Sequence, residues 1–146
     1  MSTSTDAFEL TEPELTAEDL LVVEDPHFGP ETVAIVTGAA SGIGRATAVA
    51  LAANGLTVVG ADIDEDGLDG TVDLAADVGV DGTVRPLPTD LTDDGDVEAM
   101  VETAAETGEL RYVANIAGMQ HIASIPEFPP EKYDLLLDVM LRAPFL

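Results

Sequence analysis

The sequence predicts an α/β fold built on a parallel sheet, from two observations. Short runs rich in Val, Ile and Thr alternate along the chain with longer segments in which apolar residues recur every three or four positions. Each strand-like run reaches the next through a helix-length segment, an alternation typical of βαβ units with right-handed crossovers. The predicted strands are 33–37, 57–61, 83–87 and 111–114, and the predicted helices are 43–54, 67–78, 95–107 and 130–142.

The first predicted strand runs into a glycine-rich turn with the sequence T-G-A-A-S-G-I-G at 37–44. Gly38 can adopt the backbone angles of a sharp turn. Gly42 lets backbone N–H groups approach a phosphate, and Gly44 lets the next helix pack closely on its strand. The start of that helix offers unpaired N–H groups and partial positive charge. This order of strand, turn and helix indicates a pyrophosphate site in a Rossmann-like, doubly wound sheet.

The helix at 43–54 has an apolar face that we predict from residues at steps of three and four. These are Ile43, Ala46, Ala50 and Ala53. Asn54-Gly55 is expected to end this helix, because Gly is favoured just past a helix C-terminus.

Asp62 ends the second predicted strand, 18 residues after Gly44. Its carboxylate would accept hydrogen bonds from a ribose 2′-hydroxyl and repel a 2′-phosphate, which favours NAD over NADP. The alternative is that Asp62 simply opens a polar loop. Residues 62–67 also match the opening of a calcium loop, but a strand-like run precedes them and the twelfth position is Asp73 rather than Glu, so we assign no metal.

The spacing T-G-x-x-x-G-x-G resembles the short-chain dehydrogenase/reductase family. Asp90-Leu91, after the third predicted strand, and Asn115-Ile116-Ala117-Gly118, after the fourth, also match the family, which has N-N-A-G at the second place. The resemblance covers residues 31–146 and implies an oxidoreductase that transfers hydride between NAD and a hydroxy acid or other secondary alcohol or ketone. The predicted cofactor-binding residues are Gly38, Ser41, Gly42, Ile43, Gly44, Asp62, Asp90, Leu91, Asn115, Ala117 and Gly118.

Residues 118–122 and 127–134 look like the 3-hydroxybutyrate dehydrogenase branch of the family. In that branch the Gln that matches Gln120 helps to hold the substrate carboxylate, so Gln120 is a candidate substrate contact. The alternative is a loop residue with a solvated amide.

The resemblance implies that the catalytic groups lie outside this chain. The family's Ser, Tyr and Lys fall beyond the point that matches Leu146, and Tyr133 is followed four residues later by Leu137 rather than Lys. Met140 stands where the family has a further catalytic Asn. We therefore expect no catalytic residue in this chain and no turnover from it alone.

The predicted sheet is truncated after about four strands, whereas the family sheet has the order 3-2-1-4-5-6-7. The fourth strand is then expected to form an open edge. The last helix builds the subunit interface in the family, which implies a homo-oligomer through that helix in a complete protein. Two alternatives remain: a catalytically dead module that binds NAD or another nucleotide, and a truncated remnant that associates with a full-length relative.

The composition is strongly acidic, with 29 Asp and Glu against 5 Lys and Arg and a net charge of −24. Such charge sustains solubility in concentrated salt and is typical of the cytoplasm of an extreme halophile, of haloarchaeal type. The shortage of bases disfavours nucleic acid and anionic membranes as partners. The absence of cysteine excludes disulfides and thiolate metal sites. No signal peptide or membrane span is predicted, so a cytoplasmic protein with a small-molecule substrate is expected.

Residues 1–30 are acidic, contain no Lys or Arg, and are predicted to form a flexible N-terminal extension. A partial dinucleotide-binding domain is predicted at 31–146. Within the extension, a short helix is expected from Thr11 through Val23, with Pro13 in its first turn. A strap across a neighbouring subunit is the alternative to a flexible extension.

Overall fold

The structure is a computed structural model that describes residues 15–146. Its centre is a four-stranded sheet with the order β3-β2-β1-β4, and every pairing in it is parallel. The strands are β1 (Thr32–Thr37), β2 (Thr57–Asp62), β3 (Thr83–Pro88) and β4 (Glu109–Ala114). The predicted α/β fold with a Rossmann-like parallel sheet is confirmed, and each predicted strand lies within the observed one.

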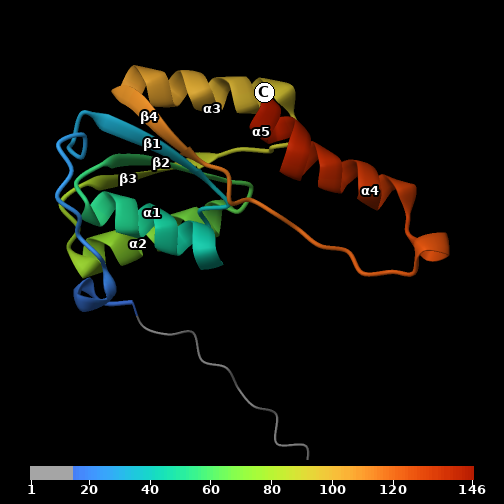
Figure 1. Cartoon of the computed structure of the whole chain (residues 1–146), viewed down its shortest axis with the longest axis horizontal. Coiled ribbons are helices and arrows are strands. Elements are labelled where there is room, and N and C mark those ends of the chain that lie inside the picture. Colours follow the sequence, from blue (N-terminus) through green and yellow to red (C-terminus); the bar gives the residue numbers. More distant parts are fainter. Residues whose placement is uncertain (1–14) are drawn as a thin grey trace, which may run out of the picture.

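Helices cover both faces of the sheet (Figure 1). The helices α1 (Gly42–Ala53) and α2 (Glu65–Val78) pack on one face. The other face carries α3 (Asp94–Thr107) and α5 (Ala143–Phe145). The helix α5 ends a C-terminal helical segment that also includes α4 (Pro130–Leu137) and the π-helical turn η3 (Asp138–Arg142). Two short 3₁₀ turns complete the described part, η1 (Ala17–Asp19) and η2 (Ile125–Glu127).

The central strand β1 is buried along its whole length, which explains its uninterrupted apolar sequence. Ala34 and Val36 belong to the core under α1 and α2, whereas Val33 and Ile35 belong to the core under α3. Successive side chains of one strand thus supply the two cores on opposite faces of the sheet.

The apolar face predicted for α1 is wrong. The buried residues of this helix are Gly44, Ala48, Val49 and Ala52. Ile43 is 76% exposed, and Ala46 is exposed as well. The helix is composed almost entirely of small apolar residues, so several series at steps of three and four compete. The buried face is the one that contains Gly44, because the backbone of Gly44 packs closely against the preceding turn.

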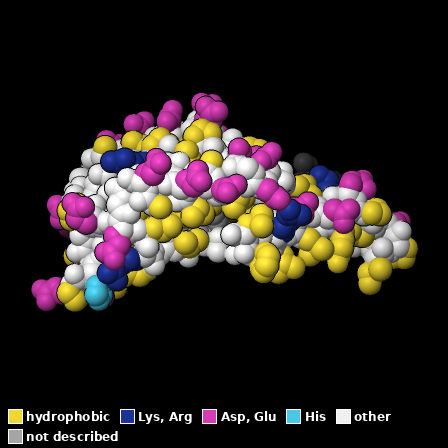
Figure 2. All heavy atoms as spheres, turned by 90° about the horizontal axis from the view of Figure 1, so that it is seen from above, with side chains coloured by type: hydrophobic (Ala, Val, Ile, Leu, Met, Phe, Trp, Pro, Cys, Tyr) yellow, Lys and Arg dark blue, Asp and Glu magenta, His cyan; other side chains and the backbone are white. Residues whose placement is uncertain are grey.

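The strand β4 is an edge of this sheet, as predicted, and β3 is the other edge. The C-terminal helical segment projects past the sheet (Figure 1) and continues three residues beyond the predicted end at 142. Hydrophobic side chains gather along this projecting part, while acidic side chains are spread over much of the remaining surface in view (Figure 2). The exposed large hydrophobic residues of the segment are Tyr133, Leu137, Met140, Leu141 and Phe145.

Residues 15–30 pack against the protein's own core. The ring of Phe28 meets Tyr112 of β4 edge-on, with ring centroids 6.0 Å apart. The side-chain amide of Asn54 donates to the carbonyl of Leu21 at 2.9 Å and accepts from the N–H of Val23 at 2.7 Å. Whether the extension is flexible, or straps a neighbouring subunit, stays a prediction.

The helix predicted to run through Val23 is wrong in its described part. Only Ala17–Asp19 is helical there, and the predicted start lies outside the described residues. The physical reason is the contact with Asn54, which binds the backbone at 21 and 23 and so competes with helical hydrogen bonds. In the described range 15–146, no helix has both the length and the apolar character that a bilayer crossing requires.

Candidate functional site

The larger cavity lies at the carboxyl ends of the strands and has a volume of about 650 Å³. This is the edge at which open α/β sheets bind ligands. All but one of the predicted cofactor-binding residues line it: Gly38, Ser41, Gly42, Ile43, Gly44, Asp62, Asp90, Leu91, Ala117 and Gly118. The structure thus gathers these residues around one space, and their roles in binding remain predictions.

The glycine turn between β1 and α1 needs glycine for steric reasons at two positions. Gly38 has a φ of +72°, and a Cβ there would lie 2.9 Å from the Cα of Ala117. A Cβ on Gly44 would lie 1.9 Å from the carbonyl oxygen of Gly38. The close approach at Gly44 is to the turn itself rather than to the strand, and it brings the N-terminus of α1 against the cavity.

Ser41 is the N-cap residue of α1, and its side chain makes no capping hydrogen bond. The first N–H groups of a helix have no partner within the helix. Since Ser41, Gly42, Ile43 and Gly44 all border the cavity, an anion placed there can meet both these N–H groups and the Ser41 hydroxyl. No lining residue in the described part of the chain is Lys or Arg.

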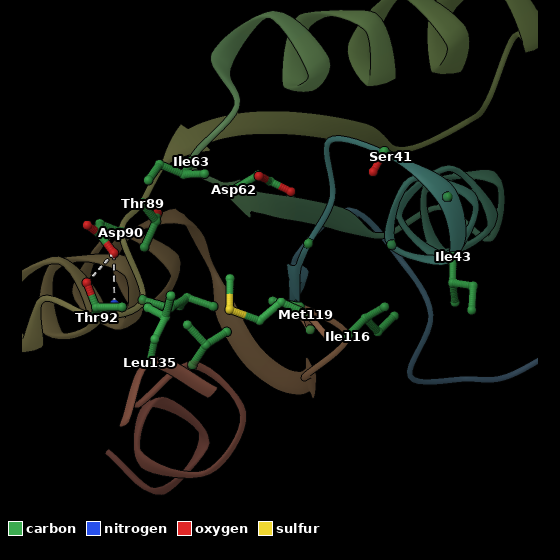
Figure 3. A pocket seen from close by; sticks show the side chains of 17 residues that line it. Ser41, Ile43, Asp62, Ile63, Thr89, Asp90, Thr92, Ile116, Met119 and Leu135 are labelled. Atoms are coloured by element: carbon green, nitrogen blue, oxygen red, sulfur yellow. Dashed lines mark hydrogen bonds between the residues drawn. The ribbon is translucent and has the colours of Figure 1, made fainter. Parts of the chain in front are cut away.

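Asp62 extends from the end of β2 toward the glycine turn (Figure 3). Its Oδ2 accepts a hydrogen bond from the N–H of Ala40 at 3.1 Å, and its Oδ1 accepts one from the N–H of Asp64 at 3.1 Å. A carboxylate offers about four lone-pair positions, so Asp62 retains capacity for ligand hydroxyl groups. Asp62 therefore fixes the turn that it faces, and its role toward a ribose remains a prediction.

Asp90 is held by its own loop. Its Oδ1 accepts from the hydroxyl of Thr92 at 2.7 Å and from the N–H of Thr92 at 2.9 Å (Figure 3). These bonds, the hydroxyl first, hold the pKa of the Asp90 carboxyl below its ordinary value. The group is therefore ionised at neutral pH and acts as a hydrogen-bond acceptor at the cavity wall.

Thr37 is a site residue to which the sequence analysis assigned no role. Its buried hydroxyl accepts hydrogen bonds from the N–H groups of Ile116 at 3.0 Å and Ala117 at 3.1 Å. This joins the end of β1 to the segment that follows β4, so both walls of the cavity are fixed to each other. The signal was present in the sequence, since Thr is the first letter of the T-G-x-x-x-G-x-G pattern.

A smaller cavity of about 200 Å³ adjoins the first and shares Leu91 and the segment 116–118 with it. Asn115 lines this second cavity instead of the first, together with Met140. The predicted substrate contact Gln120 is exposed and lines neither of these two cavities.

Both tyrosines of the chain lie away from the lining of these cavities. Tyr112 packs against Phe28, and Tyr133 is 56% exposed. Within residues 15–146, no group of three or more His, Asp or Glu side chains is placed to hold a metal ion.

Comparison with known proteins identifies the fold and the family. A family model described as short chain dehydrogenase matches residues 32–146. The "uncharacterized oxidoreductase YxjF" of Bacillus subtilis is 36% identical over 115 residues, which cover 78% of this chain and 44% of the relative. The 3-oxoacyl-[acyl-carrier-protein] reductase FabG of Thermotoga maritima is 34% identical over 114 residues, 77% of this chain and 46% of that protein.

Solved structures agree with these relatives. The NAD⁺-bound xylitol dehydrogenase matches with a TM-score of 0.71 and 26% identity, over 80% of this chain and 45% of its own. A short-chain type dehydrogenase/reductase from Mycobacterium ulcerans matches with a TM-score of 0.74 and 28% identity, over 80% and 44% of the two chains. The chain spans less than half the length of these relatives. On the match of the family model to residues 32–146, the chain belongs to the short-chain dehydrogenase family.

Proposed function

We propose that residues 32–146 bind the adenosine and pyrophosphate portion of NAD for an oxidoreductase that acts on a secondary alcohol or ketone. One observation carries the proposal: the Asp62 carboxylate and the N-terminus of α1 border the same cavity. A carboxylate at the ribose favours NAD over NADP, because it accepts from a 2′-hydroxyl and repels a 2′-phosphate. The NAD⁺-bound state of the xylitol dehydrogenase neighbour supports this choice.

The residues of the cavity fit the parts of the cofactor. The pyrophosphate would meet the N–H groups of α1 and the Ser41 hydroxyl, and the adenosine ribose would meet Asp62. The adenine would lie by Leu91, with Asp90 as a hydrogen-bond acceptor. Asn115, Ala117 and Gly118 would follow the nicotinamide side. NAD itself supplies the hydride chemistry, while the protein supplies binding and orientation.

We propose that turnover depends on groups outside residues 1–146. Neither tyrosine of this chain lines the cavity, and Met140 cannot supply the hydrogen bonds of the amide found at that position in the family. A second candidate function is a nucleotide-binding module without turnover, alone or associated with a full-length relative. The exposed apolar residues of the C-terminal helical segment favour the associated form.

A hydroxy acid is the substrate class that we propose, through the resemblance at residues 118–122. Gln120 lies in the exposed loop directly after the cavity residue Gly118, so its amide is free to meet a substrate carboxylate. The net charge of −24 supports our further proposal that the protein works in the cytoplasm of a halophile.

The test is the affinity of the 146-residue chain for NAD and NADP, measured by calorimetry in concentrated KCl. Asp62→Ala should weaken NAD binding by about tenfold or more, because hydrogen bonds to a charged group are lost, and should weaken NADP binding much less. Asp62→Asn keeps an acceptor but removes the charge, so it should narrow the NAD/NADP ratio with a smaller loss of NAD affinity.

The matched control is Asp66→Ala, which removes the same charge from an exposed residue that does not line the cavity. An NAD/NADP ratio that stays the same in Asp62→Ala contradicts the ribose assignment. The proposed absence of turnover is measured in the same preparation, where residues 1–146 should form no NADH when secondary alcohols are added.

A further inference from the structure

We propose that Arg45 and Thr71 are positioning residues that orient the peptide groups of the glycine turn from behind and thereby set the affinity of the site for a pyrophosphate. The inference rests on the proposed function and adds two residues that do not line the cavity. They must act through the turn rather than by touching the ligand.

The guanidinium of Arg45 is bound to neutral oxygens at three places. Its Nη2 donates to the carbonyl of Ala40 and, at 3.3 Å, to the carbonyl of Gly67. Its Nε donates to the hydroxyl of Thr71 at 3.1 Å. A planar fork of donors suits several acceptors at once, which a lysine ammonium does less well.

Thr71 completes the network from the middle of α2. Its side chain is fully buried, and its hydroxyl donates to the carbonyl of Ala39 at 2.7 Å. The carbonyl groups of two successive turn residues, Ala39 and Ala40, are therefore both held on the side of α2.

Because a peptide group is planar, fixing the direction of its C=O also fixes the direction of the following N–H. In a trans peptide the C=O and the following N–H point in opposite directions, and the described chain contains no cis peptide. With the Ala39 carbonyl on Thr71, the N–H of Ala40 faces the other way and donates to Asp62 Oδ2 at 3.1 Å. With the Ala40 carbonyl on Arg45, the N–H of Ser41 faces away from Arg45. Arg45 and Thr71 thus select the turn conformation that presents the N–H of Ser41 to the cavity, whereas Asp62 is also held independently by the N–H of Asp64 at 3.1 Å.

Three bases in the described part of the chain, Arg45, Arg85 and Lys132, form no ion pair, and Arg45 is the one that is bonded to the glycine turn. Arg111 pairs with Glu109, and Arg142 pairs with Asp94. Within residues 15–146, Arg45 forms no ion pair with a carboxylate, although the chain has 29 acids. Its positive charge beside the turn is therefore not neutralised by a direct partner, and it opposes the negative field of the protein near the place where an anion would bind.

The competing explanation is that Arg45 and Thr71 merely join α1 to α2. The two explanations differ in which ligand is affected. A positioning role predicts a loss confined to ligands with a pyrophosphate, whereas loosening of the two helices would weaken adenosine as well. The experiment therefore measures the binding of ADP, adenosine and NAD by calorimetry in concentrated KCl, with circular dichroism to confirm folding.

The variants are Arg45→Met, Thr71→Val and the double variant, with Thr71→Ser as the conservative rescue. Arg85→Met is the matched control, because Arg85 is exposed on β3 and does not line the cavity. Each single variant should lower ADP and NAD affinity by about tenfold to a hundredfold and leave adenosine within about twofold. The double variant should lower the affinity for ADP and NAD little more than either single variant does, because both residues act on one network.

Thr71→Ser and Arg85→Met should bind ADP as the wild type does. If Arg45→Met does not fold, Arg45→Lys is used in its place, because lysine keeps the charge. This variant should lower the affinity for ADP and NAD by an intermediate factor and leave the affinity for adenosine unchanged. Equal losses for ADP and adenosine overturn the positioning role, as does unchanged ADP affinity in a wild type that binds NAD. A wild type that binds neither NAD nor ADP overturns the proposed function and this inference with it.

Discussion

Gly44→Ala tests the close contact between α1 and the glycine turn. A Cβ at this position would lie 1.9 Å from the carbonyl oxygen of Gly38 and 2.5 Å from its carbonyl carbon. Real Cβ contacts essentially never fall under 3.0 Å, so the helix must move away from the turn by about 1 Å, the difference between 3.0 and 1.9. The obstacle is backbone, and no side-chain rotation can relieve it.

The expected cost follows from two opposing effects. Forcing a methyl group into a packed region costs up to about 3 kcal/mol, and the rigid obstacle places Gly44 at that end of the range. Replacing glycine by alanine in a helix stabilises the folded protein by up to about 1 kcal/mol, because alanine loses less conformational entropy on folding. The free energy of unfolding should therefore fall by about 2 kcal/mol, and the affinity for NAD should fall at least about tenfold because the N-terminus of α1 is displaced.

The assay is urea unfolding followed by circular dichroism, with NAD binding measured in the same buffer. Gly70→Ala is the matched control, since a Cβ on Gly70 meets only the Arg45 Nη2 at 3.6 Å, and it should stabilise the protein by about 0.4–1 kcal/mol. If Gly44→Ala unfolds at the same urea concentration as the wild type or a higher one, the steric argument is refuted.

Two further substitutions test the contacts of loops. Asn54→Ala removes the hydrogen bonds to the backbone of Leu21 and Val23, each of which contributes about 1 kcal/mol to stability. Hydrogen exchange at the Val23 amide should therefore accelerate. An unchanged exchange rate would show that Asn54 does not hold this segment. Thr92→Val should raise the pKa of Asp90 toward its ordinary value, measured by carboxyl NMR titration, and an unmoved pKa would remove Thr92 as its cause. Because the folded-state pKa is lowered, the stabilisation by Thr92 is present above the ordinary pKa of Asp and is lost as the pH falls through the lowered value.

The first two strands were predictable because their runs of β-branched and small apolar residues leave little choice of structure. The run at 33–37 is apolar at every position but the last, and such a run fits only a strand that is covered on both faces. The glycine pattern and Asp62 were predictable as neighbours because the carboxyl ends of parallel strands share one edge of the sheet. The residues within each strand and turn were therefore sufficient to predict these strands and the position of Asp62 beside the glycine turn.

The face of α1 and the network behind the turn depend on distant residues. Gly44 faces inward because of Gly38, and Arg45 donates a hydrogen bond to Thr71, 26 residues away in the chain. Likewise, the backbone near Val23 follows Asn54, 31 residues away. Periodicity and propensity contain no information about such pairings, so the sequence of a single segment does not predict them.

The charge of the protein explains why the turn must be held so firmly. In the proposed function, a pyrophosphate would bring negative charge to a protein of net charge −24, and none of the described lining residues is Lys or Arg. Attraction must then come from backbone N–H groups at the start of α1, which are effective only if their directions are fixed before the ligand arrives. Asp62 intensifies this requirement, because it adds a negative charge to the site while it holds the N–H of Ala40. In the proposed function, the fixed peptide orientation and the charge of Arg45 behind the turn would offset that repulsion.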